Sequence, residues 1–218
     1  MAAVGFCFLA LGFPGYIFFY PQPFDPLPVS PEVSVPLFDG VAKVIQSGGI
    51  PKVRYMEIAM GAVPGPMGTT GVLVIAACAL FLLSRKRIKF DIMAAAVLTV
   101  TLFAAIFQRT STSIRASIGL ELTSGMFLFA TVFLLTDFAR TPIRRFPRIL
   151  SGILFGTLTM LFRYFSGFEE GALFALVLVN AMVSPVEYAA GWIRTQIKKR
   201  IGKGKAVRYD RIRRKTIK

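Results

Sequence analysis

The chain has 218 residues, of which 55% are apolar and 17% are charged, and its mean hydropathy is +0.63. A soluble globular domain does not carry so much apolar surface against so little charge, so that class is excluded. The formal net charge is +15, but the basic residues lie in short blocks between long apolar runs. This pattern is typical of an integral membrane protein and not of a nucleic-acid-binding protein.

Six apolar runs approach the length that a helix needs to cross the hydrocarbon core, roughly 17 to 25 residues. We therefore predict an all-α, polytopic integral membrane protein with about six transmembrane helices and Gly/Pro-interrupted helix starts. The first run lacks a basic n-region and a small-residue cleavage site, which argues against a signal peptide. The predicted spans are Ala2–Tyr20, Ala62–Leu83, Phe90–Phe107, Ser117–Leu135, Ile149–Phe165 and Gly171–Trp192.

Strict alternation of these six spans places twenty of the 26 Lys and Arg residues on one side and six on the other. The positive-inside rule then puts both termini in the cytoplasm. We expect a membrane domain over residues 1–192, with the bilayer as its partner, and a basic cytoplasmic tail over 193–218. Such a tail is attracted to anionic headgroups or to an acidic partner subunit.

A long connection, 21–61, is rich in proline and resists regular structure. Within it, Leu37–Gln46 could form a short helix on the outer face, in a loop that is either solvated or in contact with a ligand. The following segment, Gly61–Leu73 (GAVPGPMGTTGVL), opens the second predicted span. Its small residues and free backbone N–H groups suit either an anionic group such as a phosphate or close packing of helices.

Polar side chains within apolar spans are costly unless they are satisfied. Glu121 is expected near the outer end of the fourth span, in the headgroup region, and Asp137 just past its inner end, where Arg140 and Arg144 could pair with it. Asn180 lies midway along the last span, where its amide must bond a neighbouring helix or a cofactor. A surface ion pair is expected at the outer mouth between the last two spans, among Arg163, Glu169 and Glu170.

Three segments resemble one known family, the RnfD/NqrB membrane proteins of the Rnf complex and of the sodium-pumping NADH:quinone reductase. Gly61–Leu73 is similar to the family's G-x-x-P-G-S-x-G-E-T-S-x-L motif, with Pro66, Thr69 and Gly71 as departures. Ser124–Pro142 resembles the family's small-residue helix that ends in A-T-D-P, with Phe138 in place of the proline. Leu161–Tyr188 resembles its closing helix, including Arg163, Glu170 and Asn180.

The resemblance implies a location in the prokaryotic cytoplasmic (inner) membrane and a flavin, FMN or riboflavin, as the cofactor. The family attaches FMN to a threonine, but the aligned segment here, Glu32–Leu37, has Val35 at that position, and no threonine precedes Thr69. Any flavin is therefore expected to bind non-covalently. The expected cofactor-binding residues are Gly65, Met67, Gly68, Thr69 and Thr70, with Ser34 as a poor substitute for the threonine. The expected polar residues of ionic or structural importance are Asp137, Asn180, Arg163 and Glu170.

The family's usual N-terminal helices have no counterpart in this sequence, so we expect either a shortened reading frame or a first half carried by another chain. The leading hypothesis is a membrane subunit of an Rnf/Nqr-like ion-translocating electron-transport complex, relaying electrons through a flavin or scaffolding one beside flavoprotein subunits. It would be part of a redox-driven translocase and not a catalyst alone. The alternatives are a small-molecule channel or transporter of urea-channel-like ancestry, and a purely structural subunit that has lost its flavin.

Overall fold

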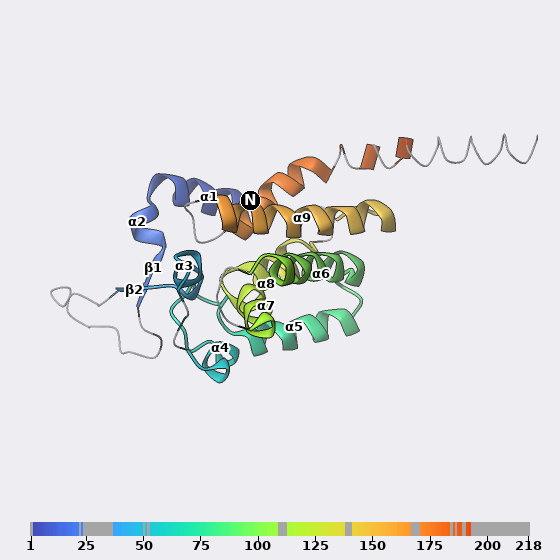
Figure 1. Cartoon of the computed structure of the whole chain (residues 1–218). Coiled ribbons are helices and arrows are strands. Elements are labelled where there is room, and N and C mark those ends of the chain that lie inside the picture. Colours follow the sequence, from blue (N-terminus) through green and yellow to red (C-terminus); the bar gives the residue numbers. More distant parts are fainter. Residues whose placement is uncertain are drawn as a thin grey trace, which may run out of the picture.

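The computed structural model describes residues 2–21, 23, 37–49, 51, 53–108, 113–137, 141–166, 171–183, 185, 187–188 and 191–192. Within these residues the fold is mainly helical, with one small two-stranded sheet (Figure 1). The elements are α1 (Ala2–Gly12), α2 (Pro14–Ile17), β1 (Phe19–Pro21), β2 (Leu37–Asp39), α3 (Val41–Gln46), α4 (Tyr55–Met60), α5 (Val72–Ser84), α6 (Phe90–Ile106), α7 (Ile114–Thr123), α8 (Phe127–Phe129), the π-helix η1 (Ala130–Leu134), α9 (Arg145–Phe165) and a last helix, Gly171–Val183.

Helix length separates this fold from the simple prediction of six spans. No single helix in the described part of the chain is both long and apolar enough to cross a membrane. The helices Ile114–Thr123 and Phe127–Leu134 form one pair that is bent by 64°. Taken together, these two helices are long and apolar enough to cross a membrane.

Two predicted spans begin and end close to where the structure has helices. Phe90–Phe107 corresponds to α6, and Ile149–Phe165 to α9, which starts four residues earlier at Arg145. The sixth span, predicted at Gly171–Trp192, is continuous in the structure only as far as Val183 within the described residues.

The other three predicted spans are interrupted. The first, Ala2–Tyr20, ends as a helix at Gly12 because Pro14 lacks an N–H and disfavours helical backbone in the residue before it. The second does not begin at Ala62, since two prolines and a left-handed Gly68 (φ 77°) exclude helix before Val72. The fourth breaks after Thr123, as described below.

The sheet corrects the all-α expectation locally. β1 and β2 pair antiparallel, with Tyr20 opposite Phe38. The helix expected over Leu37–Gln46 therefore begins only at Val41, because its first three residues are in the strand. The hairpin and α3 lie together at the left of Figure 1.

Helices α6 and α9 form the centre of the fold and run parallel. Gly152 of α9 lies against the backbone of α6, where a Cβ would be 2.5 Å from the Ile92 carbonyl oxygen, and one on Gly156 would be 2.8 Å from Thr99 Cβ. These two glycines, four residues apart, let the helix backbones approach closely. On another side of α9, the ring of Phe155 stacks on that of Phe127 at 5.8 Å between centroids.

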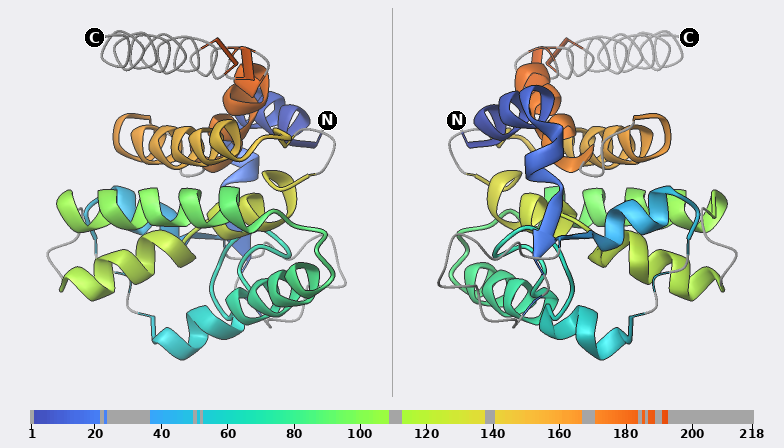
Figure 2. Two further views of the ribbon diagram at one scale, coloured as in Figure 1. Left: turned by 90° about the vertical axis from the view of Figure 1, so that its right-hand side faces the viewer. Right: turned by 90° about the vertical axis from the view of Figure 1, so that its left-hand side faces the viewer.

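The last helix runs antiparallel to α9. Its first residue, Gly171, is packed against Thr159 and Phe162 near the end of α9, while Glu187 and Gly191 lie beside the segment that precedes α9. Helix α1 lies beside this last helix in both views of Figure 2 and shares its buried core through Ala3 and Cys7. This arrangement gathers the basic segments 85–89 and 144–148 at one end of the bundle and the hairpin, α3 and α4 toward the other.

Candidate functional site

The candidate site is a crevice where three segments distant in sequence meet. The glycine-rich segment contributes Gly65, Pro66 and Thr70, and the break in the fourth predicted span contributes the three residues Thr123–Gly125. The hairpin and α3 close the third side. The crevice has a volume of about 20 Å³, which is room for one water molecule.

The glycine-rich segment is a compact loop and not the start of a helix. Gly61 ends α4 in the left-handed conformation (φ 82°), and a Cβ on it would lie 2.9 Å from Gly71 Cα, so the two ends of the loop touch. Inside the loop the Thr69 hydroxyl donates to the Pro66 carbonyl at 2.9 Å. Gly65–Thr70 is therefore not a helix N-terminus, because the helix starts at Val72. That these residues hold a phosphate stays a prediction.

The break between α7 and α8 forms the opposite wall. Ser124 takes an extended conformation and Gly125 has φ 68°, which interrupts the helix after Thr123. A break of this kind leaves carbonyl groups at the end of α7 without the N–H donors that a continuous helix would supply. Buried carbonyl groups need another donor.

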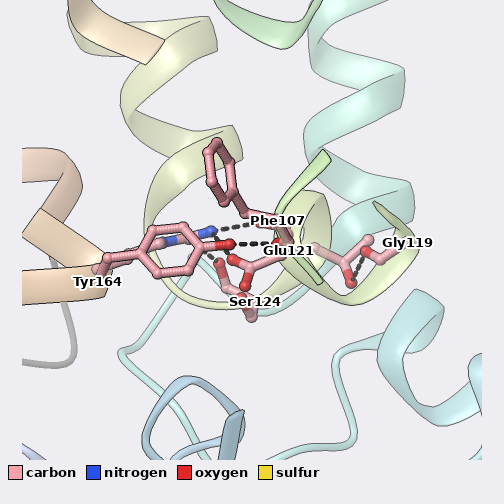
Figure 3. Close-up of polar contacts among 7 residues, drawn as sticks. Phe107, Gly119, Glu121, Ser124 and Tyr164 are labelled. Atoms are coloured by element: carbon pink, nitrogen blue, oxygen red, sulfur yellow. Dashed lines mark hydrogen bonds and ion pairs between the residues drawn. The ribbon is translucent and has the colours of Figure 1, made fainter. Parts of the chain in front are cut away.

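Arg163 supplies those donors from α9. Its Nη1 donates to the Glu121 carbonyl oxygen at 2.5 Å and to the Glu121 carboxylate at 2.8 Å, and its Nη2 donates to the Ser124 carbonyl oxygen at 2.8 Å (Figure 3). The planar guanidinium suits this task because it presents several N–H groups in one plane. Arg163 thus stabilises the broken conformation that lines the crevice.

The Arg163–Glu121 ion pair is deeply buried, with each side chain only 3% exposed. The Arg163 guanidinium also lies 5.8 Å from the ring centroid of Phe127. The expectation of an exposed ion pair at Arg163 is therefore wrong, whereas the headgroup location of Glu121 stays a prediction. Losing one member of a buried pair leaves an uncompensated charge, whose cost is several kcal/mol.

The neighbouring Tyr164 adds a contact on the same end of α9. Its hydroxyl donates to the Phe107 carbonyl oxygen, just past the end of α6 (Figure 3). Gln46 of α3 donates to the Ser166 carbonyl oxygen at 2.6 Å. The end of α9 is thereby joined to the helix break, to α6 and to α3.

A second buried arginine does the same at the start of α9. Arg148 is 7% exposed and donates to the carbonyl oxygens of Pro142 at 3.1 Å and Ile143 at 2.6 Å. It also pairs with Asp91 in the first turn of α6, at 3.1 Å. At each end, therefore, α9 presents an arginine that binds one carboxylate and two backbone carbonyl groups.

The remaining predicted site residues are dispersed. Met67 is 96% exposed and Gly68 is also exposed. Asp137 is exposed and lies next to Thr141, toward the end of the bundle where α9 begins, and half-buried Asn180 does not line the crevice. Ser34, Glu169, Glu170 and Arg140 lie outside the described residues.

Sequence reasoning missed the partnership of Glu121 with Arg163, although it noted each residue separately. The available signal was that alternation of the predicted spans puts both charges on the outer side, near the start of the fourth span and the end of the fifth.

Comparison of the chain with family models decides its affiliation: the model of the NQR2, RnfD, RnfE family matches residues 1–191. The chain belongs to this family.

Curated relatives agree with the family model. One, from Stutzerimonas stutzeri, is described as the subunit designated D of an ion-translocating oxidoreductase complex; the chain is 31% identical to it over 128 residues, which is 59% of this chain and 36% of the relative. The chain is 35% identical over 108 residues to proteins with the same description from Salmonella enteritidis PT4 and Salmonella newport, covering 50% of this chain and 31% of each. The matched part of the chain thus spans about a third of the length of these relatives. Membership implies a membrane location.

The family is associated with flavin-binding complexes, so the crevice can be tested for a fit to flavin. The crevice has room for about one water molecule and therefore not for an isoalloxazine ring. The loop is also closed on itself, because a Cβ on Gly65 would lie 2.5 Å from Thr70 Cγ2. The crevice residues of this chain therefore do not enclose a flavin.

Proposed function

We propose that this chain is a polytopic membrane subunit of an Rnf/Nqr-like ion-translocating electron-transport complex, and that it scaffolds a flavin without enclosing one. The observation that carries the proposal is the meeting of the glycine-rich segment and the helix break at one crevice, braced by the buried Arg163–Glu121 pair. The family membership and the printed descriptions of the relatives support the complex.

The crevice suits the role of a scaffold. Its walls are backbone-rich and held by short contacts, so they present a rigid surface with few bulky side chains. Met67, at the tip of the loop, is 96% exposed and available to a neighbouring subunit. A flavin borne by a partner could then rest against this loop, with its phosphate or ring edge near Thr70.

The experiment is to purify the complex through a tag on this chain in mild detergent, and to compare its flavin spectrum with in-gel fluorescence of the separated subunits. We expect flavin in the intact complex and no fluorescent band at 24.0 kDa. A fluorescent band at this mass would contradict non-covalent association. Absence of flavin from the intact complex would contradict the scaffold role.

A variant then tests the crevice itself. Thr70→Ala should lower the flavin content of the purified complex, because Thr70 lines the crevice on the side of the exposed loop and the substitution removes its hydroxyl. Ser84→Ala is the matched control, since that hydroxyl is exposed and only bonds the Phe81 carbonyl within its own helix. Equal flavin content in both variants and in the wild type would exclude the crevice from flavin contact.

A second candidate function is a small-molecule channel or transporter. The bent pair α7 and α8–η1, with a buried ion pair at the bend, favours it, because transporters place interrupted helices and charged groups along their substrate path. Solute uptake by proteoliposomes of the chain without any electron donor would support this function. Uptake that requires an electron donor would support the translocating complex.

A further inference from the structure

A second concavity lies at the other end of the bundle, between the segment before α9 and the far end of the last helix. This open cleft has a volume of about 750 Å³ and is lined by Ile143, Arg144, Glu187, Tyr188, Gly191 and Trp192. It is distant from the crevice along α9, since the crevice adjoins the end of that helix and the cleft adjoins its start. None of its residues takes part in the proposed scaffold.

The cleft contains one positive and one negative group that do not pair with each other. Among the described residues no ion pair joins Arg144 to Glu187. The Glu187 carboxylate accepts a hydrogen bond only from the Ile143 N–H, at 3.3 Å, within the described part of the chain. The Arg144 guanidinium extends over the last helix, with Nη1 3.9 Å from the position of a Cβ on Gly191. Opposite charges held apart in one cleft complement a ligand that carries both charges.

Two exposed aromatic side chains complete the cleft. Tyr188 is 79% exposed and Trp192 is 60% exposed. The same end of the bundle carries the basic residues Arg85, Lys86, Arg87 and Arg145. Trp and Tyr beside Lys and Arg are typical of the boundary between hydrocarbon and headgroups, and a Trp face also attracts ammonium groups.

We propose that this cleft binds the headgroup of a zwitterionic aminophospholipid, phosphatidylethanolamine. The lipid phosphate would bind Arg144, since guanidinium groups bind phosphate through charge-assisted hydrogen bonds. The primary ammonium would donate to Glu187 and lie near Trp192. The inference rests on the membrane location in the proposed function.

The single tryptophan makes the cleft directly observable, because Trp192 is the only one in the sequence. The full chain is reconstituted into phosphatidylcholine vesicles that contain increasing amounts of one lipid with a nitroxide near the top of its acyl chain. The labelled lipid is phosphatidylethanolamine, phosphatidylglycerol or phosphatidylcholine. Quenching of Trp192 fluorescence reports the occupancy of the cleft.

We expect an association constant about tenfold higher for phosphatidylethanolamine than for phosphatidylcholine, the factor supplied by one charge-assisted hydrogen bond from the ammonium. Glu187→Gln should abolish this preference, and Arg144→Gln should weaken binding of the headgroup. Arg145→Gln is the matched control, because Arg145 is exposed at the start of α9 but does not line the cleft. It should keep the wild-type preference.

The outcomes separate the two levels of inference. Equal quenching by all three lipids contradicts selective binding of a headgroup in the cleft, and it leaves the membrane location unaffected. Stronger quenching by phosphatidylglycerol that persists in Glu187→Gln overturns the zwitterionic ligand in favour of an anionic one. No quenching by any lipid overturns the placement of this end of the bundle at the membrane boundary, and with it the cleft, whereas the proposed function is tested separately by the flavin content of the complex.

Discussion

Replacing Arg163 by leucine should destabilise the chain by about 3–5 kcal/mol, the usual cost of breaking a buried ion pair by removing one partner. The variant leaves the Glu121 carboxylate buried without its cation, and it leaves the carbonyl groups of Glu121 and Ser124 without their donors. The free energy of unfolding is measured on the full chain in mixed micelles, by denaturant titration followed with far-UV circular dichroism.

Two further variants separate the effect of losing the charge from the effect of losing the hydrogen-bond donors. Arg163→Lys keeps the charge but not the planar set of donors, so it should recover only part of the loss. In the double variant Arg163→Leu/Glu121→Leu the charges are gone. For a simple ion pair this would be neutral or stabilising, but here the two carbonyl groups still lack the N–H donors of Arg163, so we expect a remaining loss of about 2 kcal/mol.

The control for these measurements is Arg145→Leu on the same helix, which should change stability by less than about 0.5 kcal/mol because Arg145 is exposed. The reasoning is refuted if Arg163→Lys matches the wild type. It is also refuted if the double variant regains full stability, since the carbonyl contacts would then contribute nothing.

Three other substitutions test the packing and the breaks with the same titration. Gly152→Ala should lower the free energy of unfolding by about 1–3 kcal/mol, because its Cβ would lie 2.5 Å from the Ile92 carbonyl oxygen. The control is Gly119→Ala in α7, where a Cβ has no neighbour within 4 Å, so this variant should be neutral or stabilising. Equal effects of the two substitutions would contradict the close approach of α6 and α9. Gly125→Ala should cost about 1–2 kcal/mol because of its φ of 68°, with Gly125→Asn less harmful; a neutral Gly125→Ala would contradict the left-handed turn. Asp91→Asn should cost no more than about 1 kcal/mol, since its carboxylate is 37% exposed and the ion pair is screened by solvent; a loss as large as that of Arg163→Leu would show that burial is not what distinguishes the two pairs.

Hydropathy located the helices but not their interruptions. The predicted spans Phe90–Phe107 and Ile149–Phe165 contain no proline, and their predicted and observed bounds agree closely. In Ser117–Leu135 the break depends on Gly125, and a single glycine in an apolar run does not by itself distinguish a helix-packing contact from a turn. What makes the turn stable is Arg163, which lies 38 positions later in sequence. A local pattern cannot contain that information.

The site shows the same division between local and distant causes. The glycine-rich segment stood out because prolines and glycines at close spacing resist a helix, and its residues Gly65 and Thr70 do line the crevice. Its conformation depends on the contact of Gly61 with Gly71, which no periodicity predicts. Glu121 and Arg163 were each conspicuous as charges in apolar segments, yet their pairing follows from how α7 and α9 pack.

The two buried arginines of α9 have a mechanical consequence. They are fifteen residues apart in one uninterrupted helix, about 22 Å along its axis. Each holds irregular backbone, the bend after α7 at one end and the segment before α9 at the other. A rotation of α9 as a rigid body would withdraw both guanidinium groups from their carbonyl partners at once. The contacts at the two ends of the bundle therefore both depend on the position of one helix.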